Sequence, residues 1–115
     1  MNVETVTEKI SCGFVLKLTG DVDMNTSTEV RSALAAIFKQ GSPGMRALLI
    51  DLSHVRYMDS SGIATLVECM QHCMKTGARL RLCELSPAVR DVFELARLAS
   101  VFEIFKTLGE ASAGL

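Results

Sequence analysis

Residues 47–62 read Ala-Leu-Leu-Ile-Asp-Leu-Ser-His-Val-Arg-Tyr-Met-Asp-Ser-Ser-Gly, an apolar run followed by a polar turn. The continuous apolar run at residues 47–50 is typical of a strand covered by helices on both faces of its sheet. Asp59 and Ser60 are residue types that start helices, because their side-chain oxygens accept hydrogen bonds from the free N–H groups of a first turn. We therefore predict a buried strand that leads through this turn into a helix over residues 60–76.

The chain before residue 47 has the pattern of a hairpin followed by a helix. Alternating apolar residues predict two short strands within residues 3–19. Thr26 and Glu29 have the spacing of a capping box, in which each side chain satisfies a backbone N–H group at a helix start. Gly41 and Pro43 end this helix, because glycine tolerates a left-handed cap and proline cannot continue a helix.

The chain after residue 76 continues the alternation of strands and helices. Residues 80–83 form a further apolar run, and Ser86-Pro87 is typical of a helix start, with serine as cap and proline in the first turn. A last strand at residues 102–105 and a weak C-terminal helix complete the expected order. Each of the three longer helices has an apolar stripe at helical spacing. We expect the following residues to face the core: Val30, Leu34, Ile37 and Phe38, then Ile63, Leu66, Val67, Met70 and Met74, and then Val89, Val92, Phe93 and Ala96.

Strands that alternate with helices indicate parallel crossover units. We therefore expect an α/β fold, with a mixed, mainly parallel sheet, an N-terminal hairpin and helices packed over the sheet. The 115 residues leave room for one domain. We expect this domain to span residues 1–108 and residues 109–115 to form a loose C-terminal tail.

The composition disfavours several classes of function. A net charge of −1, one Tyr and no Trp argue against nucleic-acid binding, which needs basic surfaces or base-stacking platforms. No apolar run is long enough for membrane insertion, and the N-terminus lacks the pattern of a secretion signal. We therefore expect a cytoplasmic protein. The four cysteines would then be reduced thiols that behave as small buried hydrophobic residues.

The turn at residues 59–62 is the sharpest candidate site. One interpretation is structural, because Asp59 or Ser60 could act as the helix cap and nothing more. A second interpretation is a phosphorylation site on Ser60, at the carboxyl end of a buried strand. The partial positive charge of a helix N-terminus would accept the phosphate there, and a docked partner would detect the new negative charge.

A catalytic site and a metal site are weaker alternatives. Ser60 or Ser61 could be a nucleophile with His54 as base and Asp51 or Asp59 as the residue that orients it, but the G-x-S-x-G elbow is absent. Cys69, His72 and Cys73 share a helix face, and a zinc ion would need a fourth ligand such as Cys83. Partial burial explains the cysteines better. We expect no enzyme activity, no metal and no cofactor.

Five segments, in order along the chain, resemble the STAS domain, and most closely the bacterial anti-sigma-factor antagonists. The matching segments are residues 20–26, 50–62, 77–82, 92–95 and 102–105. The combination of Asp59-Ser60-Ser61-Gly62 with the preceding Asp-Leu-Ser-His-Val-Arg-Tyr-Met is the most specific part. Ala64 departs from the pattern, since relatives often carry a second glycine there.

The resemblance implies a binding protein without catalysis of its own. Its unphosphorylated form would bind a serine kinase that is also an anti-sigma factor, and so release the sigma factor. The kinase would switch the protein off by phosphorylating Ser60, and a serine phosphatase would reset it. Asp23 matches a position near that serine. Asp23, Asp59, Ser60, Ser61 and Gly62 are therefore the expected partner-binding residues.

A second function within the same family stays open. STAS proteins also serve as subunits of ABC-type lipid-transport complexes, where a similar helix face binds the ATPase. Phosphate transfer to Ser60 would favour the first function, and a tight complex with an ATPase without phosphate transfer would favour the second.

Overall fold

The computed structural model describes residues 3–41 and 44–115. Five strands form one sheet in the order β1-β2-β3-β4-β5, in which β1 and β2 are antiparallel and all other neighbours are parallel. This arrangement confirms the predicted α/β fold with an N-terminal hairpin. The elements are β1 (Glu4–Ile10), β2 (Gly13–Val22), α1 (Ser27–Gly41), β3 (Ala47–Met58), α2 (Ser60–Thr76), β4 (Arg79–Cys83), α3 (Pro87–Leu95), β5 (Glu103–Phe105) and α4 (Leu108–Ser112).

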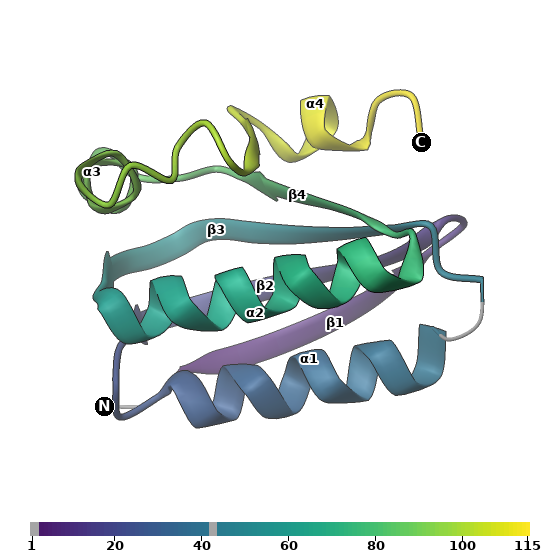
Figure 1. Ribbon diagram of the computed structural model, residues 1–115, viewed down its shortest axis with the longest axis horizontal. Helices are drawn as coiled ribbons and strands as arrows, with labels where there is room; N and C mark the ends of the chain where they lie inside the picture. Colours follow the sequence, from purple (N-terminus) through teal and green to yellow (C-terminus); the bar gives the residue numbers. More distant parts are fainter. Residues whose placement is uncertain (1–2, 42–43) are drawn as a thin grey trace.

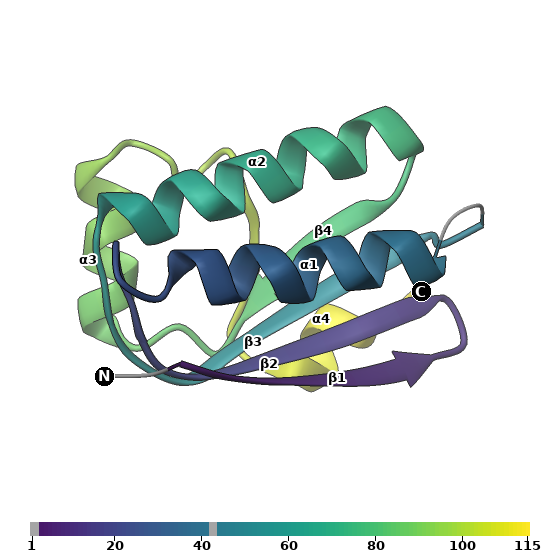
Figure 2. The ribbon, with the colours of Figure 1, turned by 90° about the horizontal axis from the view of Figure 1, so that it is seen from below.

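The helices cover the two faces of the sheet unequally. α1 and α2 lie side by side over one face, and the short α4 lies on the other (Figures 1 and 2). α3 lies at the end of the sheet where β3 leads into α2 (Figure 1). The larger core cluster fills the space beneath α1, α2 and α3, and β3 contributes Leu48, Ile50 and Leu52 to it. Ala47 and Leu49 face the other way and pack with Ala111 of α4. The central strand is therefore buried on both faces, as its apolar run predicts.

β3 is longer than the sequence predicts. It continues to Met58, with exposed residues at four positions in its second half. The apolar run that we used to recognise the strand stops at Ile50, so the largely polar segment after it resembled a loop. β2 pairs with the extension as far as Val22 and Met58, after two register shifts near Gly20. The extension carries the chain directly to the start of α2.

Three expectations about the helices are wrong. Met74 and Ala96 are exposed. The buried face of α2 runs through Leu66, Cys69 and Cys73 rather than through Met74, and α3 ends at Leu95, before Ala96. The capping box is also absent. The Thr26 hydroxyl accepts a hydrogen bond from Asp23 N (3.0 Å) and donates one to Asp21 O (2.8 Å). It is therefore committed to the preceding loop, and Glu29 N bonds the Thr26 carbonyl instead.

The expected weak C-terminal helix is present as α4, inside the segment that we expected to be a loose tail. Ala111 is fully buried against the sheet. The Arg81 Nη1 group donates to the carbonyl oxygens of Ala111 (2.8 Å) and Ala113 (3.0 Å). One arginine of β4 thereby holds the last turn of the chain. The predicted hairpin, the end of α1 at Gly41 and the Ser86 cap of α3 are confirmed, whereas Pro43 lies outside the described residues.

Candidate functional site: a serine turn at the carboxyl edge of the sheet

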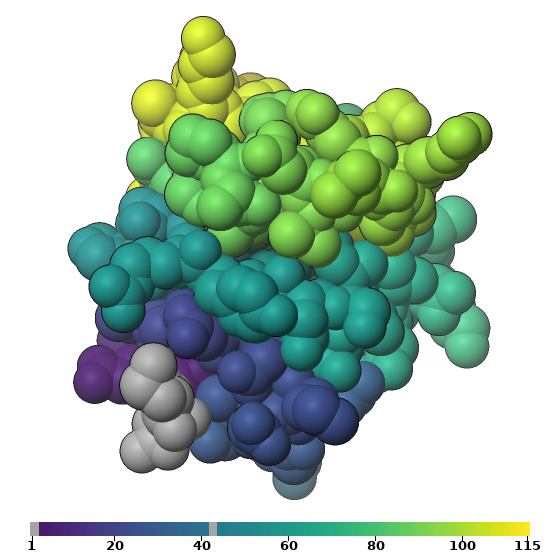
Figure 3. Space-filling model, turned by 90° about the vertical axis from the view of Figure 1, so that its left-hand side faces the viewer, coloured from purple at the N-terminus to yellow at the C-terminus, as the bar shows by residue number. Residues whose placement is uncertain are grey.

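The carboxyl ends of β2 and β3 meet at one edge of the molecule, which faces the viewer in Figure 3. Val22 is paired with Met58 there, and Asp59 N donates a hydrogen bond to Val22 O at 3.2 Å. Two loops that are far apart in sequence are thereby joined, one leading into α1 and the other into α2. This edge is where α/β folds commonly place their sites.

Asp59 is the N-cap of α2. Its backbone is extended (φ −108°, ψ −170°), and its Oδ1 atom accepts hydrogen bonds from Ser61 N (2.8 Å) and Gly62 N (3.3 Å). The sequence left the cap open between Asp59 and Ser60, and the structure assigns it to Asp59. Ser60 is the first residue of the helix, and its side chain is exposed. Within residues 3–41 and 44–115 no hydrogen bond of its hydroxyl group is found.

Gly62 is buried because the two loops approach each other closely at this point. A Cβ atom on Gly62 would lie 2.6 Å from Met58 Cγ and 2.7 Å from the carbonyl oxygen of Val22. A real Cβ atom cannot come so close to a backbone oxygen. Gly62 therefore sets the distance between the first turn of α2 and the end of β2, and its role in the fold is structural.

Asp23 repeats the capping arrangement at the neighbouring loop. Its Oδ1 atom accepts hydrogen bonds from Asn25 N (2.9 Å) and Thr26 N (3.2 Å), immediately before α1 begins. Asp23 follows Val22, which bonds Asp59. The structure thus brings the expected residues Asp23, Asp59 and Ser60 to one edge, each capping aspartate using one oxygen for its own loop.

Thr65 is a contact residue of this site that the sequence analysis missed. It is buried, and its hydroxyl group donates a hydrogen bond to the Ser61 carbonyl oxygen at 2.9 Å. A threonine four residues after another helical residue often bonds back to the preceding turn. The i, i+4 spacing from Ser61 was therefore the available signal.

The geometry gives no support to a catalytic site in which Ser60 or Ser61 is the nucleophile and His54 is the base. His54 lies in β3, and its Nδ1 atom contacts the Ser53 hydroxyl at 3.0 Å. Asp51 is buried, accepts a hydrogen bond from Ser53 N and lies 3.9 Å from Lys17 Nζ. Both groups interact with residues other than Ser60 and Ser61.

The four cysteines are buried free thiols. Burial, followed by the nearby negative charges of Asp51 and Glu84, raises the pKa of Cys83 to about 12. A hydrogen bond with Cys73 and burial hold the pKa of Cys69 far above its ordinary range. Among residues 3–41 and 44–115 no cluster of three or more His, Cys, Asp or Glu side chains could hold a metal ion. In the same ranges no helix is long and apolar enough to span a bilayer.

Comparisons with known proteins match this sequence and its fold. The sequence model of the STAS domain matches residues 3–111. An anti-sigma-B factor antagonist of Listeria monocytogenes is 33% identical over 91 residues, which are 79% of this chain and 77% of the relative. The crystal structure of an anti-sigma factor antagonist from Mycobacterium paratuberculosis has a TM-score of 0.83 at 28% identity, covering 95% of this chain and 90% of that one.

A third similar structure is that of the Bacillus cell fate determinant SpoIIAA in its phosphorylated form. Its TM-score is 0.70 at 23% identity, and the match covers 94% of this chain and 96% of that chain. This likeness concerns the fold. Because the family model covers nearly the whole chain, the protein belongs to the STAS domain family.

Proposed function

We propose that this protein is an anti-sigma factor antagonist that binds an anti-sigma serine kinase in its unphosphorylated form. Phosphorylation of Ser60 switches it off, and a serine phosphatase restores it. The names of its relatives support this function over a role as an ABC-transporter subunit. The protein acts by binding in the cytoplasm, and it catalyses no reaction of its own.

The observation that carries the proposal is the position of the Ser60 side chain. It is exposed at the end of the molecule and takes no part in the described hydrogen bonds that hold the turn. A kinase can therefore reach the hydroxyl group without opening the fold. Asp59 already occupies the N–H groups of Ser61 and Gly62, so a phosphate on Ser60 would project toward solvent and a docked partner.

The electrostatic consequence is local. A phosphate adds about −1.5 to −2 charges at neutral pH. It would stand beside the carboxylates of Asp59 and, across the loop contact, Asp23. A partner surface that fits this edge before phosphorylation would then meet a much more negative potential, and like-charge contacts across an interface cost several kcal/mol.

The test combines the protein with ATP and its candidate kinase and follows intact mass and complex formation. We expect one added phosphate in the parent, none in Ser60→Ala, and retention of the phosphate in the matched control Ser61→Ala. Ser60→Ala should fold within ±0.5 kcal/mol of the parent, because Asp59 is the cap and the site is exposed, and should remain bound in the presence of ATP.

Charge is tested separately from shape. Ser60→Asp should bind the kinase at least tenfold more weakly than the parent, whereas Asp59→Asn should keep the cap, since asparagine is as good an N-cap as aspartate. Parent-like binding by Ser60→Asp would show that negative charge at this turn is not the switch. A stable complex with a transporter ATPase and no phosphate transfer would favour the alternative function.

A further inference from the structure

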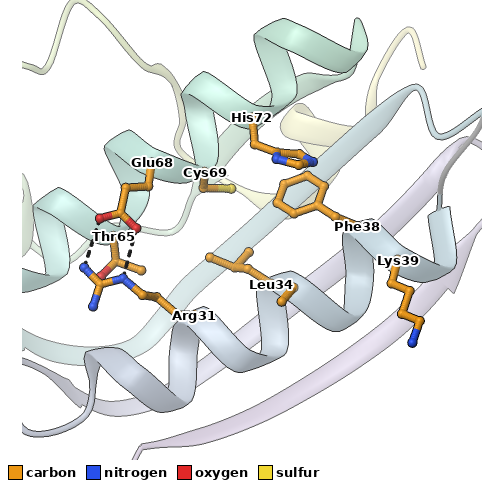
Figure 4. Close-up of a pocket in the computed structure, with 9 residues that line it drawn as sticks. Arg31, Leu34, Phe38, Lys39, Thr65, Glu68, Cys69 and His72 are labelled. Carbon is orange, nitrogen blue, oxygen red and sulfur yellow. Dashed lines mark hydrogen bonds and ion pairs between the residues drawn. The ribbon is translucent and has the colours of Figure 1, made fainter.

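A groove of about 530 Å³ runs between α1 and α2 (Figure 4). Its volume falls in the range of small-molecule sites, about 300–1,000 Å³. Matching stripes of the two helices line it, each at the i, i+3, i+4, i+7 spacing of one helix face. The stripes are Arg31, Leu34, Ala35 and Phe38 of α1 and Thr65, Glu68, Cys69 and His72 of α2, with Lys39 at the rim.

Contacts between the two helices fix both ends of this groove. At one end Arg31 and Glu68 form a bidentate ion pair, with Nε–Oε1 at 2.9 Å and Nη2–Oε2 at 3.0 Å. This pair lowers the pKa of Glu68, which therefore stays ionised. At the other end the rings of Phe38 and His72 contact each other, with their centroids 4.0 Å apart and their planes tilted by 40°. The two contacts bridge α1 and α2 at the two ends of the groove.

The interior of the groove is apolar. Leu34 and Cys69 are buried at its floor, and Figure 4 shows both side chains between the two helices. The Thr65 hydroxyl group uses its proton in the bond to Ser61 O, and Glu68 uses both carboxylate oxygens in the pair with Arg31. The central part of the groove therefore favours an apolar body that makes no demand for hydrogen bonds.

The side chains that line the groove carry more positive than negative charge. The lining contains two basic side chains, Arg31 and Lys39, and one carboxylate, Glu68. Arg31 is neutralised by Glu68, and within residues 3–41 and 44–115 no carboxylate lies within 4.0 Å of Lys39 or His72. Figure 4 shows the Lys39 ammonium group turned away from α2, but its flexible four-carbon stem allows it to swing across the rim. The surplus positive charge thus lies at the Phe38–His72 end.

We propose that this groove binds a small amphipathic monoanion, a carboxylate with an apolar chain. The chain lies along Leu34, Phe38 and Cys69, and the carboxylate group lies at the end that carries Lys39 and His72. The groove meets the serine turn at Thr65, which bonds Ser61 O, but Ser60 does not line it. Octanoate binding therefore tests this proposal without testing phosphorylation of Ser60.

Medium-chain carboxylates are the probes for this site. Octanoate added to ¹⁵N-labelled protein should shift the amide signals of residues 34–39 and 65–72 in a saturable way. Decanoate should bind more tightly than octanoate, by up to about fourfold for each added CH₂ group. This factor corresponds to the ~0.8 kcal/mol gained by burying one CH₂ group, at 1.4 kcal/mol per tenfold change in affinity. Octanol should bind several-fold more weakly than octanoate. Shifts that are absent, or equal affinities for octanol and octanoate, would overturn the proposal.

Matched variants locate the site. Ala35 lines the groove and Ala36 does not, and both are exposed on α1. Ala35→Trp should fill the groove and abolish octanoate binding, whereas Ala36→Trp should leave it unchanged. Lys39→Gln should weaken octanoate binding about threefold at low salt and leave octanol binding unchanged. Lys75→Gln, which removes a cation of α2 outside the groove, is its control. If the two tryptophan variants, or the two glutamine variants, changed octanoate binding equally, octanoate would not bind in this groove as proposed. The two lysine variants still test the proposal if Ala35→Trp fails to fold.

Discussion

At the scale of single residues, adjacent positions of the turn have different physical roles. Asp59 closes the first turn of α2, Ser60 faces solvent, and Gly62 packs against the end of β2. The sequence identified these residues as one motif. The sequence could not separate their roles, because aspartate and serine are equally good caps and a glycine after a cap can be required for several different structural reasons.

Gly62→Ala tests the close contact between the two loops. The new Cβ atom would lie within 2.7 Å of both Met58 Cγ and Val22 O, so the backbone must move. We expect a loss of about 1–3 kcal/mol in the free energy of unfolding, typical of overpacking, measured by urea denaturation. Gly109→Ala is the control, because Thr107 Oγ1 at 3.8 Å is the nearest atom there. If Gly62→Ala and Gly109→Ala had equal free energies of unfolding, the two loops would be able to move apart without a loss of stability.

At the scale of elements, periodicity predicted the order of strands and helices but not all their ends. The predicted end of α2 at Thr76 is confirmed, and Gly77 caps the helix with a left-handed φ of 83°. The length of β3 was missed because residues 53–58 repeat two exposed positions and one buried position beside a bulged partner strand, which is not the strict alternation of a half-buried strand. The groove between α1 and α2 could not be predicted, since stripe patterns do not give the distance between two packed helices.

The position of α4 depends on a contact that the sequence does not reveal. Arg81 is nearly buried, and its Nη1 group bonds the Ala111 and Ala113 carbonyl oxygens at the end of this short helix. Its guanidinium group also lies over the Phe105 ring at 5.1 Å. Nothing in the local pattern of residues 108–115 indicates this partner, which is about thirty residues away.

Arg81→Met should therefore loosen α4 while leaving an aliphatic side chain over Phe105. Hydrogen bonds to a charged donor contribute about 1.5–3 kcal/mol, so we expect amide exchange in residues 108–113 to become at least tenfold faster. Hydrogen exchange followed by NMR gives the rates. The matched variant is Arg79→Met, which removes the exposed ion pair with Glu103 and should leave these rates unchanged. Slow exchange in Arg81→Met would show that burial of Ala111 alone holds the helix.

At the scale of the whole molecule, two apolar clusters on opposite faces of one sheet share the central strand. The sequence predicted this arrangement from the apolar run of β3 and the alternation of elements. It did not predict the protonation of buried groups. Cys83 lies in the smaller cluster, is fully buried and has a pKa of about 12, mainly because burial disfavours the thiolate.

This pKa predicts a pH dependence of stability. The ordinary value is 9.0, so the unfolded chain loses the Cys83 proton before the folded protein does. The contribution of Cys83 is complete below pH 9 and is lost as pH rises toward 12. Urea unfolding under reducing conditions should show a decline in the parent from pH 9 to 11 and a shallower decline in Cys83→Ala, although that variant is less stable at pH 7. Parallel profiles would mean that other groups cause the decline.

The exposure of Ser60 outside the capping hydrogen bonds has a consequence for the timing of the proposed switch. If Ser60 is phosphorylated as proposed, adding or removing the phosphate would leave the packing of both clusters untouched, and no slow refolding step would separate the two states. The response time would then depend on the opposing kinase and phosphatase alone, and one molecule could pass through many cycles without exposing its interior to proteases.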